Sequence, residues 1–219
     1  RAVRFPFLFV PMEESSTEKY PMYGVCRHQD YLGLGSALTN KHHDNDLADI
    51  MEIGATTVRF AHYQQSDYLY SRCDSLGLVI WAEIPFVNQV TGEEAENAKS
   101  QLREMIRQSY NHPSIYVWGL HNEVYSPTPY TAQLTAELHD LAKTEDPYRE
   151  NALYFYNPKI ATCSWMKEIE KCNVTTIGSV NLNADIQAMN RYYGWYEGRI
   201  KDIDKWVDGL TKNYSDLRL

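Results

Sequence analysis

Short apolar runs that end in polar residues alternate along this chain with segments of helical spacing. The clearest run is 114–124 (SIYVWGLHNEV), in which β-forming residues lead to Asn122 and Glu123. A short continuous apolar run is typical of a strand buried on both faces of a parallel sheet. Strands that alternate with helices predict βαβ units, and right-handed crossovers wind such units into a barrel or an open doubly wound sheet.

The alternation covers most of the chain. Predicted strands are 22–26, 57–60, 78–82, the run before Glu123, 152–156 and 174–179. Predicted helices are 44–52 or 46–52, a segment between Ser66 and Gly77, one that opens at Thr91 with Leu102, Met105, Ile106 and Tyr110 inward, one with Leu134, Leu138 and Leu141, one at 160–171, and a final one with Ile200, Ile203, Trp206, Val207 and Leu210. Residues 186–191 carry both helical and strand-like features.

Polar residues follow four successive predicted strands. They are His28 and Asp30, then His62, then Glu83, then Asn122 and Glu123. Catalytic groups of barrels collect at the carboxyl ends of the strands, so this pattern favours a barrel with its active site there. An acid that is partly desolvated at such a place is suited to donate a proton, which makes Glu123 the first catalytic candidate. A single histidine or acid of this kind is more often a structural hydrogen-bonding residue; four in register favour function.

Composition narrows the function classes. The net charge of −8 argues against a nucleic-acid partner, and no apolar run reaches the ~18 residues of a membrane span. No G-x-G-x-x-G or P-loop motif follows a strand, so we expect no nucleotide cofactor. The four cysteines form no CxxC pair, so no zinc site is indicated; a Cys163–Cys172 bridge stays open. Residues 1–14 make a poor signal peptide, which leaves the bacterial cytoplasm and the periplasm both open.

The residues also resemble a known family. The chain is similar to the catalytic (βα)8 barrel of the family 2 glycoside hydrolases, the group of β-galactosidases, β-glucuronidases and β-mannosidases. Within this group its sequence looks most similar to β-galactosidases. The matching stretches are GVCRHQD at 24–30, TTVRFAHYQQSDYLYSRCDSLGLVIWAEIP at 56–85, NHPSIYVWGLHNEV at 111–124 and NADIQAMNRYYGWYEG at 183–198. The resemblance implies a TIM-type α/β barrel and a retaining β-glycosidase that acts on a β-linked galactoside or a related sugar without a cofactor or metal.

The resemblance assigns roles residue by residue. Glu123 matches the general acid/base, and Asn122 matches the residue that hydrogen-bonds the sugar 2-hydroxyl. The remaining residues implied to bind substrate are His28, Asp30, His62, Tyr192 and Tyr196. Trp118 is expected in the core below Glu123 rather than against a sugar.

The chain also departs from the family pattern. No nucleophile segment resembling S/T-E-Y-G follows NRYYGWY, and the seventh and eighth family strands are missing. Residues 1–21 and 150–178 read as atypical, and a closed barrel normally takes about 250 residues. We therefore expect a single domain, 1–219, that is an incomplete or shortened barrel. Either 7–11 (FLFVP) adds a closing strand, or the 200–210 helix covers the open edge, or that edge self-associates.

Three functions compete on the sequence. The first is a β-glycosidase domain whose activity is weak or absent, because its substitutes for the nucleophile (Glu83, Glu13 and Glu14) stand in no nucleophile motif. The second is a non-catalytic barrel scaffold, truncated or engineered, that at most binds a sugar. The third is a metal-dependent lyase or isomerase, which the His/Asp/Glu set permits but no ligand spacing demands.

Overall fold

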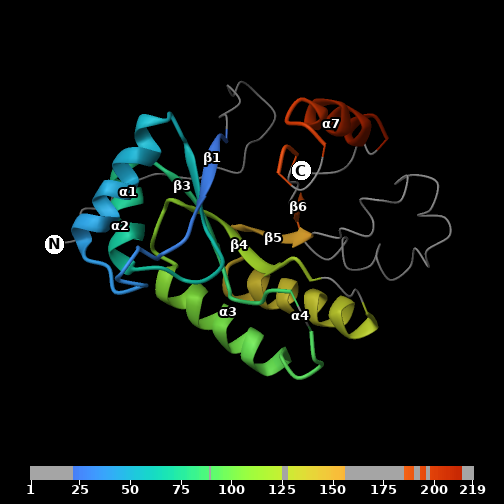
Figure 1. Ribbon diagram of the computed structural model, residues 1–219. Helices are drawn as coiled ribbons and strands as arrows, with labels where there is room; N and C mark the ends of the chain where they lie inside the picture. The colour runs from blue at the N-terminus through green and yellow to red at the C-terminus, as the bar shows by residue number, and fades with distance from the viewer. Residues whose placement is uncertain are drawn as a thin grey trace, which may run out of the picture.

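The computed structural model describes residues 22–88, 90–124, 128–155, 185–189, 193–195 and 198–213 (Figure 1). Six strands in this part of the chain form one sheet in sequential order: β1 (Gly24–Arg27), β2 (Thr57–Phe60), β3 (Val79–Glu83), β4 (Ile115–Asn122), β5 (Glu150–Phe155) and β6 (Ile186–Met189). Every neighbouring pair is parallel. Sequential parallel order with a helix after each of the first four strands is the arrangement of a TIM-type barrel, which confirms the predicted fold class.

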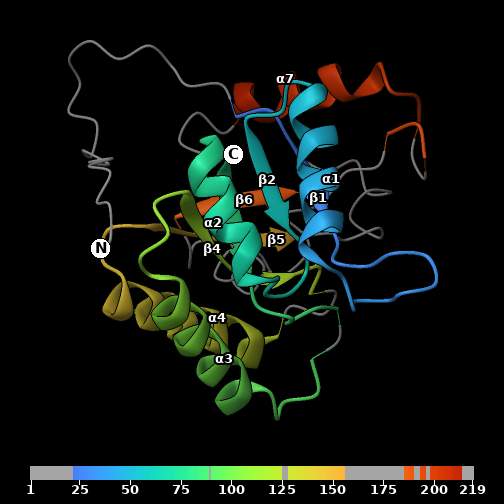
Figure 2. The same ribbon diagram turned by 90° about the vertical axis from the view of Figure 1, so that its left-hand side faces the viewer.

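Helices cover the outer side of this sheet. These helices are α1 (Asn40–Glu52), α2 (Asp67–Leu76), α3 (Ala95–Ser109) and α4 (Pro129–Glu145); the fifth described helix is α7 (Asp202–Asn213). Figure 2 shows α1 and α2 side by side across one flank, with α3 and α4 side by side below them. Helix α7 lies apart from these four, near β6 (Figure 1).

Local signals fix several helix ends. Gly77 follows α2 with φ of 72°, a left-handed conformation that glycine adopts without the steric cost of a Cβ. Thr128 caps α4 by accepting a hydrogen bond from Thr131 N, and Pro129 fills the first helical turn. The predicted boundary at Gly77 is confirmed.

The core lies between these helices and the sheet. Leu102, Met105 and Ile106 of α3 and Leu134 and Leu138 of α4 are buried, as their helical spacing predicts. Trp118 of β4 is fully buried, which confirms its expected place in the core.

One core prediction is wrong. Tyr110 continues the spacing of Ile106, yet it is 38% exposed. It lies one residue past the end of α3 at Ser109, and the Arg149 guanidinium lies over its ring. The ambiguous segment 186–191 contains a strand, β6, and its parallel pairing with β5 settles that choice. The predictions for 7–11, 160–171, 174–179 and the Cys163–Cys172 bridge lie outside the described residues.

Candidate active site

Parallel pairing brings the predicted polar strand ends to one edge of the sheet. Glu83 is the last residue of β3 and Asn122 the last residue of β4, while His28 and His62 follow β1 and β2. The registers align β1 with β2, β2 with β3 and β3 with β4, so these ends lie next to one another. Glu123 comes directly after Asn122 at the same edge.

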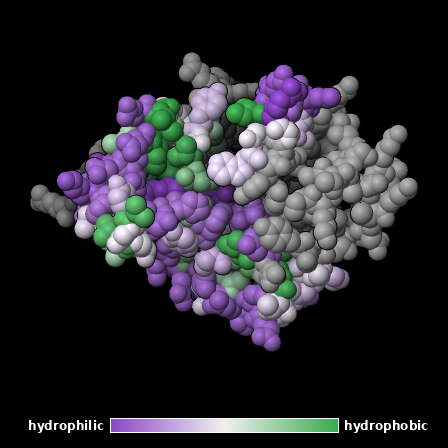
Figure 3. All heavy atoms as spheres, viewed as in Figure 1, coloured by the Kyte–Doolittle hydropathy of each residue, from purple (hydrophilic) through white to green (hydrophobic). Residues whose placement is uncertain are grey.

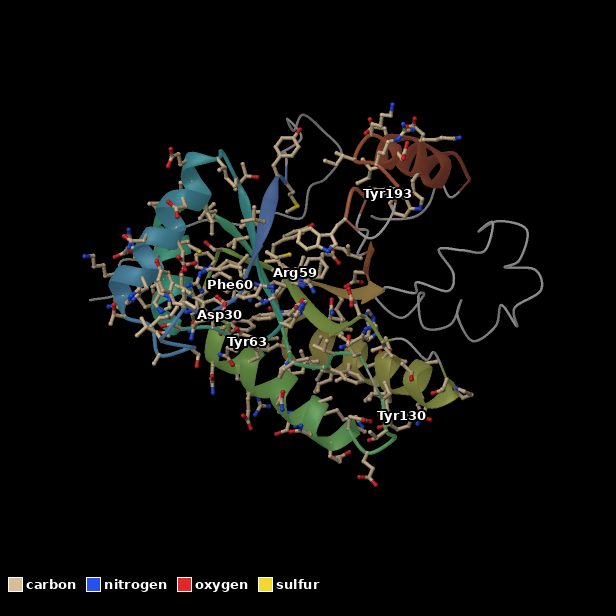
Figure 4. The ribbon with its side chains drawn as sticks, viewed as in Figure 1. Asp30, Arg59, Phe60, Tyr63, Tyr130 and Tyr193 are labelled. Atoms are coloured by element: carbon tan, nitrogen blue, oxygen red, sulfur yellow. The ribbon has the colours of Figure 1, made fainter. Side chains whose placement is uncertain are left out.

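Arg59 joins these strand ends, and the sequence reading missed it. This side chain comes from β2, is 7% exposed and lies among the central strands (Figure 4). Its Nε donates to Glu83 Oε2 at 2.9 Å, and its Nη2 donates to Glu83 Oε1 at 2.9 Å and to Asn122 Oδ1 at 2.8 Å. A lone arginine inside an otherwise apolar strand was the available signal, since charged residues are rarely buried unless paired.

Glu83 is the most deeply buried acid of the group, with 1% of its side chain exposed. Besides Arg59 it binds His62 Nδ1 at 2.7 Å through Oε1, and it accepts from Trp81 Nε1 at 3.1 Å through Oε2. Gly119 of β4 makes room for it, because a Cβ there would meet Glu83 Cβ and would lie 2.7 Å from Trp81 Nε1. Burial and hydrogen bonding therefore hold this carboxylate in one place.

Two histidines extend the cluster. The rings of His28 and His62 meet edge to face with centroids 5.2 Å apart. Partial burial lowers the pKa of His28 below its usual value, the neighbouring His62 and Arg59 add to this effect, and Asp30 and Glu83 oppose it. Asp30 lies in the loop after β1 and acts on the cluster through its charge.

The backbone around Glu123 is held by the loop after β3. Asn122 N donates to Phe86 O at 2.8 Å, and Asn88 N donates to Asn122 O at 3.0 Å. Glu123 follows with φ of 51°, in the left-handed region, and its side chain is partly exposed. A non-glycine residue in this region costs roughly 1–2 kcal/mol, and such strain collects at functional sites.

A second network supports this edge from the side of α1. Arg27, 5% exposed, donates through Nε to Asp46 Oδ2 at 3.0 Å, and its Nη2 contacts His43 Nδ1 at 3.0 Å. Gln65 Nε2 in turn donates to the Arg27 carbonyl at 2.6 Å. These contacts fix the end of β1, from which His28 and Asp30 project.

Two predicted sugar contacts, Tyr192 and Tyr196, lie outside the described residues. Tyr193 between them packs its ring against Trp206 of α7 at 6.4 Å and is drawn beside that helix (Figure 4). The part of the chain that the structure describes contains no group of three or more side chains suited to hold a metal ion. Its helices are also too short or too polar to cross a membrane.

The fold defines a class of protein, the TIM-type α/β barrels, whose active sites lie at the carboxyl ends of the strands. Residues 18–217 match the model of the glycosyl hydrolases family 2, TIM barrel domain, and the chain belongs to this family. The family resemblance of the sequence is thereby confirmed.

Several relatives carry glycosidase names. The chain is 38% identical over 208 residues to a β-glucuronidase of Bacteroides fragilis, covering 91% of this chain and 27% of that protein. Among solved structures, a Bacteroides fragilis protein assigned as a β-galactosidase is 66% identical with a TM-score of 0.78, covering 90% of this chain and 27% of the other. A Bacteroides uniformis β-glucuronidase is 33% identical with a TM-score of 0.76, covering 90% and 24%. The chain thus spans about a quarter of the length of these relatives.

Proposed function

We propose that this chain is the part of a β-glycosidase barrel that carries the general acid/base, Glu123, and much of the sugar-binding surface. Asn122, His28, His62 and Asp30 contribute hydrogen-bonding groups to the sugar. The main observation behind this proposal is that Arg59 hydrogen-bonds both Glu83 and Asn122 at the strand ends. Glu123, which has a strained backbone and a partly exposed side chain, follows directly after Asn122. Tyr192 and Tyr196 belong to the proposal through the family resemblance.

The retaining mechanism needs a second carboxylate about 5–5.5 Å from the first, to act as nucleophile. Glu83 is poorly suited to that role, because Arg59, His62 and Trp81 already occupy both of its oxygens. We therefore expect the 219-residue chain to bind sugar and to turn it over weakly or not at all. Groups that act as a unit lose far more than their share of the rate when one is missing.

For the substrate we favour a β-galactoside over a β-glucuronide. A glucuronide carboxylate would need a cationic partner, and the Arg59 donors Nε and Nη2 are directed at Glu83 and Asn122. The high identity to the protein assigned as a β-galactosidase agrees with this preference. The glucuronidase names among the relatives make the glucuronide the competitor to test.

The test is calorimetric titration of the purified chain with a matched pair of ligands, an aryl β-galactoside and an aryl β-glucuronide. We expect galactoside binding that weakens roughly tenfold in Asn122→Ala, the worth of about one hydrogen bond. Glu93→Gln serves as the control. It removes the charge of an exposed acid in the loop between β3 and α3 and should leave binding unchanged. Tighter glucuronide binding would reverse the substrate assignment, and absence of binding to both ligands would leave only the scaffold function.

Turnover of the same aryl galactoside is measured in parallel. We expect little product from the wild-type chain. Robust turnover that disappears in Glu123→Gln would contradict the expected impairment and would require a substitute nucleophile.

A further inference from the structure

The hydrogen atoms around Glu83 can be counted, and the count constrains His62. Arg59 Nη2 carries two hydrogens. One points to Glu83 Oε1 at 2.9 Å and the other to Asn122 Oδ1 at 2.8 Å. Because an amide nitrogen accepts no hydrogen bond, the atom of Asn122 that faces Arg59 is its oxygen.

His62 Nδ1 lies 3.2 Å from the same Nη2 and 2.7 Å from Glu83 Oε1. Neither Nη2 hydrogen remains for this nitrogen, and a bare ring nitrogen at 2.7 Å from a carboxylate oxygen would set two lone pairs against each other. Nδ1 therefore carries the proton and donates it to Glu83. In the neutral ring the lone pair is then on Nε2.

We infer that Glu83 is a positioning residue: it holds His62 in the Nδ1–H tautomer, so that Nε2 is a hydrogen-bond acceptor for a sugar hydroxyl. This inference rests on the proposed function for the identity of the ligand. His62 keeps 30% of its side chain exposed, and no hydrogen bond among the described residues engages Nε2. The site then recognises a hydroxyl that donates its hydrogen at this point, and it disfavours a group that can only accept.

The same contacts orient Asn122. Since Arg59 binds Oδ1, the NH2 group of Asn122 is turned away from Arg59. The buried Arg59–Glu83 ion pair therefore fixes the hydrogen-bonding groups of two side chains at the strand ends: Nε2 of His62 is an acceptor, and the NH2 group of Asn122 is a donor. Gly119 belongs to this arrangement, because only a residue without a Cβ leaves room for Glu83 and Trp81.

The direct test is the tautomer of His62 in the full 219-residue chain. Long-range 1H–15N correlation spectra at neutral pH distinguish a protonated ring nitrogen from a bare one, and the His62→Gln spectrum assigns the signals. We expect a protonated Nδ1 and a bare Nε2. A protonated Nε2, in either the other tautomer or the imidazolium form, would overturn the inference.

Glu83→Gln provides the variant test. Arg59 Nε and Trp81 Nε1 both donate to Oε2, whereas Arg59 donates to Oε1 only through Nη2. The amide oxygen therefore takes the Oε2 place, and the NH2 group faces His62 Nδ1. We expect the ring to switch to the Nε2–H tautomer, whereas the charge-matched control Glu93→Gln keeps the original one. An unchanged tautomer in folded Glu83→Gln would show that Glu83 does not set it; if this variant does not fold, the wild-type spectrum alone decides.

Addition of the aryl β-galactoside separates this inference from the proposed function. A shift of the Nε2 signal on binding supports both. A bare Nε2 with no response to sugar supports the tautomer but contradicts the sugar-binding role. Sugar binding with a protonated Nε2 contradicts the inference and leaves the proposed function standing.

Discussion

The two ends of the strands hold clusters of the same residue types in different surroundings. At the carboxyl ends, which we call the mouth, Arg59 pairs with Glu83, which also binds His62 and Trp81. At the amino ends, which we call the base, Arg149 pairs with Asp146, which also accepts from Trp118 Nε1 at 3.0 Å. The base also contains a histidine, His112, whose Nδ1 lies 2.6 Å from Asp74 Oδ2.

The partners of the two arginines differ. Arg149 donates to three backbone carbonyls, those of Ile115, Tyr110 and His112, at 2.8, 2.9 and 3.0 Å. Its guanidinium also lies over the rings of Trp118 and Tyr110. The hydrogen bonds of Arg59 described above run to the side chains of Glu83 and Asn122, and Glu83 in turn binds His62. The arginine of the base therefore holds loop backbone in place, whereas the arginine of the mouth positions other side chains. This difference is expected for the two faces of a barrel.

Figure 3 shows a face that is mostly hydrophilic over the described residues, with hydrophobic atoms in small separate patches. The hydrophobic side chains are gathered instead in the core between sheet and helices, where Trp118, Phe60 and Ile80 are fully buried. The polar residues of the mouth thus lie at the edge of an apolar core.

The largest expected effect is at the base. Asp146→Ala leaves Arg149 and Trp118 without their buried carboxylate and should lower the free energy of unfolding by about 3–5 kcal/mol. Urea titration followed by circular dichroism measures the loss. The His62 tautomer in the folded fraction should not change; a changed tautomer would break the separation between base and mouth.

A packing change at the mouth should cost less stability but alter the site. Gly119→Ala inserts a methyl group against Glu83 and Trp81, and overpacking of this kind costs roughly 1–3 kcal/mol. We expect weaker sugar binding and a disturbed His62 signal as well. Gly77→Ala is the matched control: its φ of 72° makes the substitution strained, but nothing lies within 4 Å of the new Cβ, so only stability should fall.

The sequence predicted the framework well because periodicity and turn residues are local. The strand Thr57–Phe60 and the helix closed by Gly77 were predicted at their observed boundaries. The strand before Glu123 was predicted from its apolar run and ends at Asn122. Each of these features depends on residues that are close together in the sequence.

The central ion pair was not predicted, because it joins residues far apart in the chain. Arg59 and Glu83 are separated by 24 positions, and only the register of β2 with β3 brings them together. Glu83 was therefore interpreted as a weak substitute nucleophile, although its oxygens are occupied. The inward placement of Tyr110 failed for a related reason, since helical spacing alone does not show its contacts with Arg149, 39 positions along the chain.

A pH titration of stability should sharpen the comparison at the base. The hydrogen bond to Asp74 raises the pKa of His112, so the folded state favours the protonated ring. The contribution is fully present below about pH 6.5, the unfolded value, and is lost as pH rises through the raised folded pKa. His112→Gln should therefore cost about 1–2 kcal/mol in acid and less in alkali. A cost that grew with pH would contradict this assignment.

His43, in the network beside the mouth, should show the opposite trend. Burial lowers its pKa, and the charge of Arg27, whose Nη2 lies 3.0 Å from Nδ1, adds to the effect. Its contribution is present above about pH 6.5 and is lost as pH falls through the lowered folded pKa. His43→Gln should cost about 1 kcal/mol at neutral pH and less in acid. Parallel urea titrations of the two histidine variants at several pH values compare the trends directly.

The smallest expected effect has the opposite sign. Glu123 holds φ of 51°, which glycine adopts freely, so Glu123→Gly relieves backbone strain in the folded state. Glycine also makes the unfolded chain more flexible, which offsets part of this gain. The net effect should be a rise of about 0.5–1 kcal/mol in the free energy of unfolding. Glu104→Gly removes the same side chain from an exposed position in α3, where helical φ needs no glycine, and should lower it by about 1 kcal/mol. Opposite signs for the two variants in urea titration would show that the mouth keeps Glu123 at a cost in stability. If Glu123→Gly destabilised the chain as Glu104→Gly does, the interactions of the glutamate side chain would outweigh its backbone strain, and its role would be partly structural.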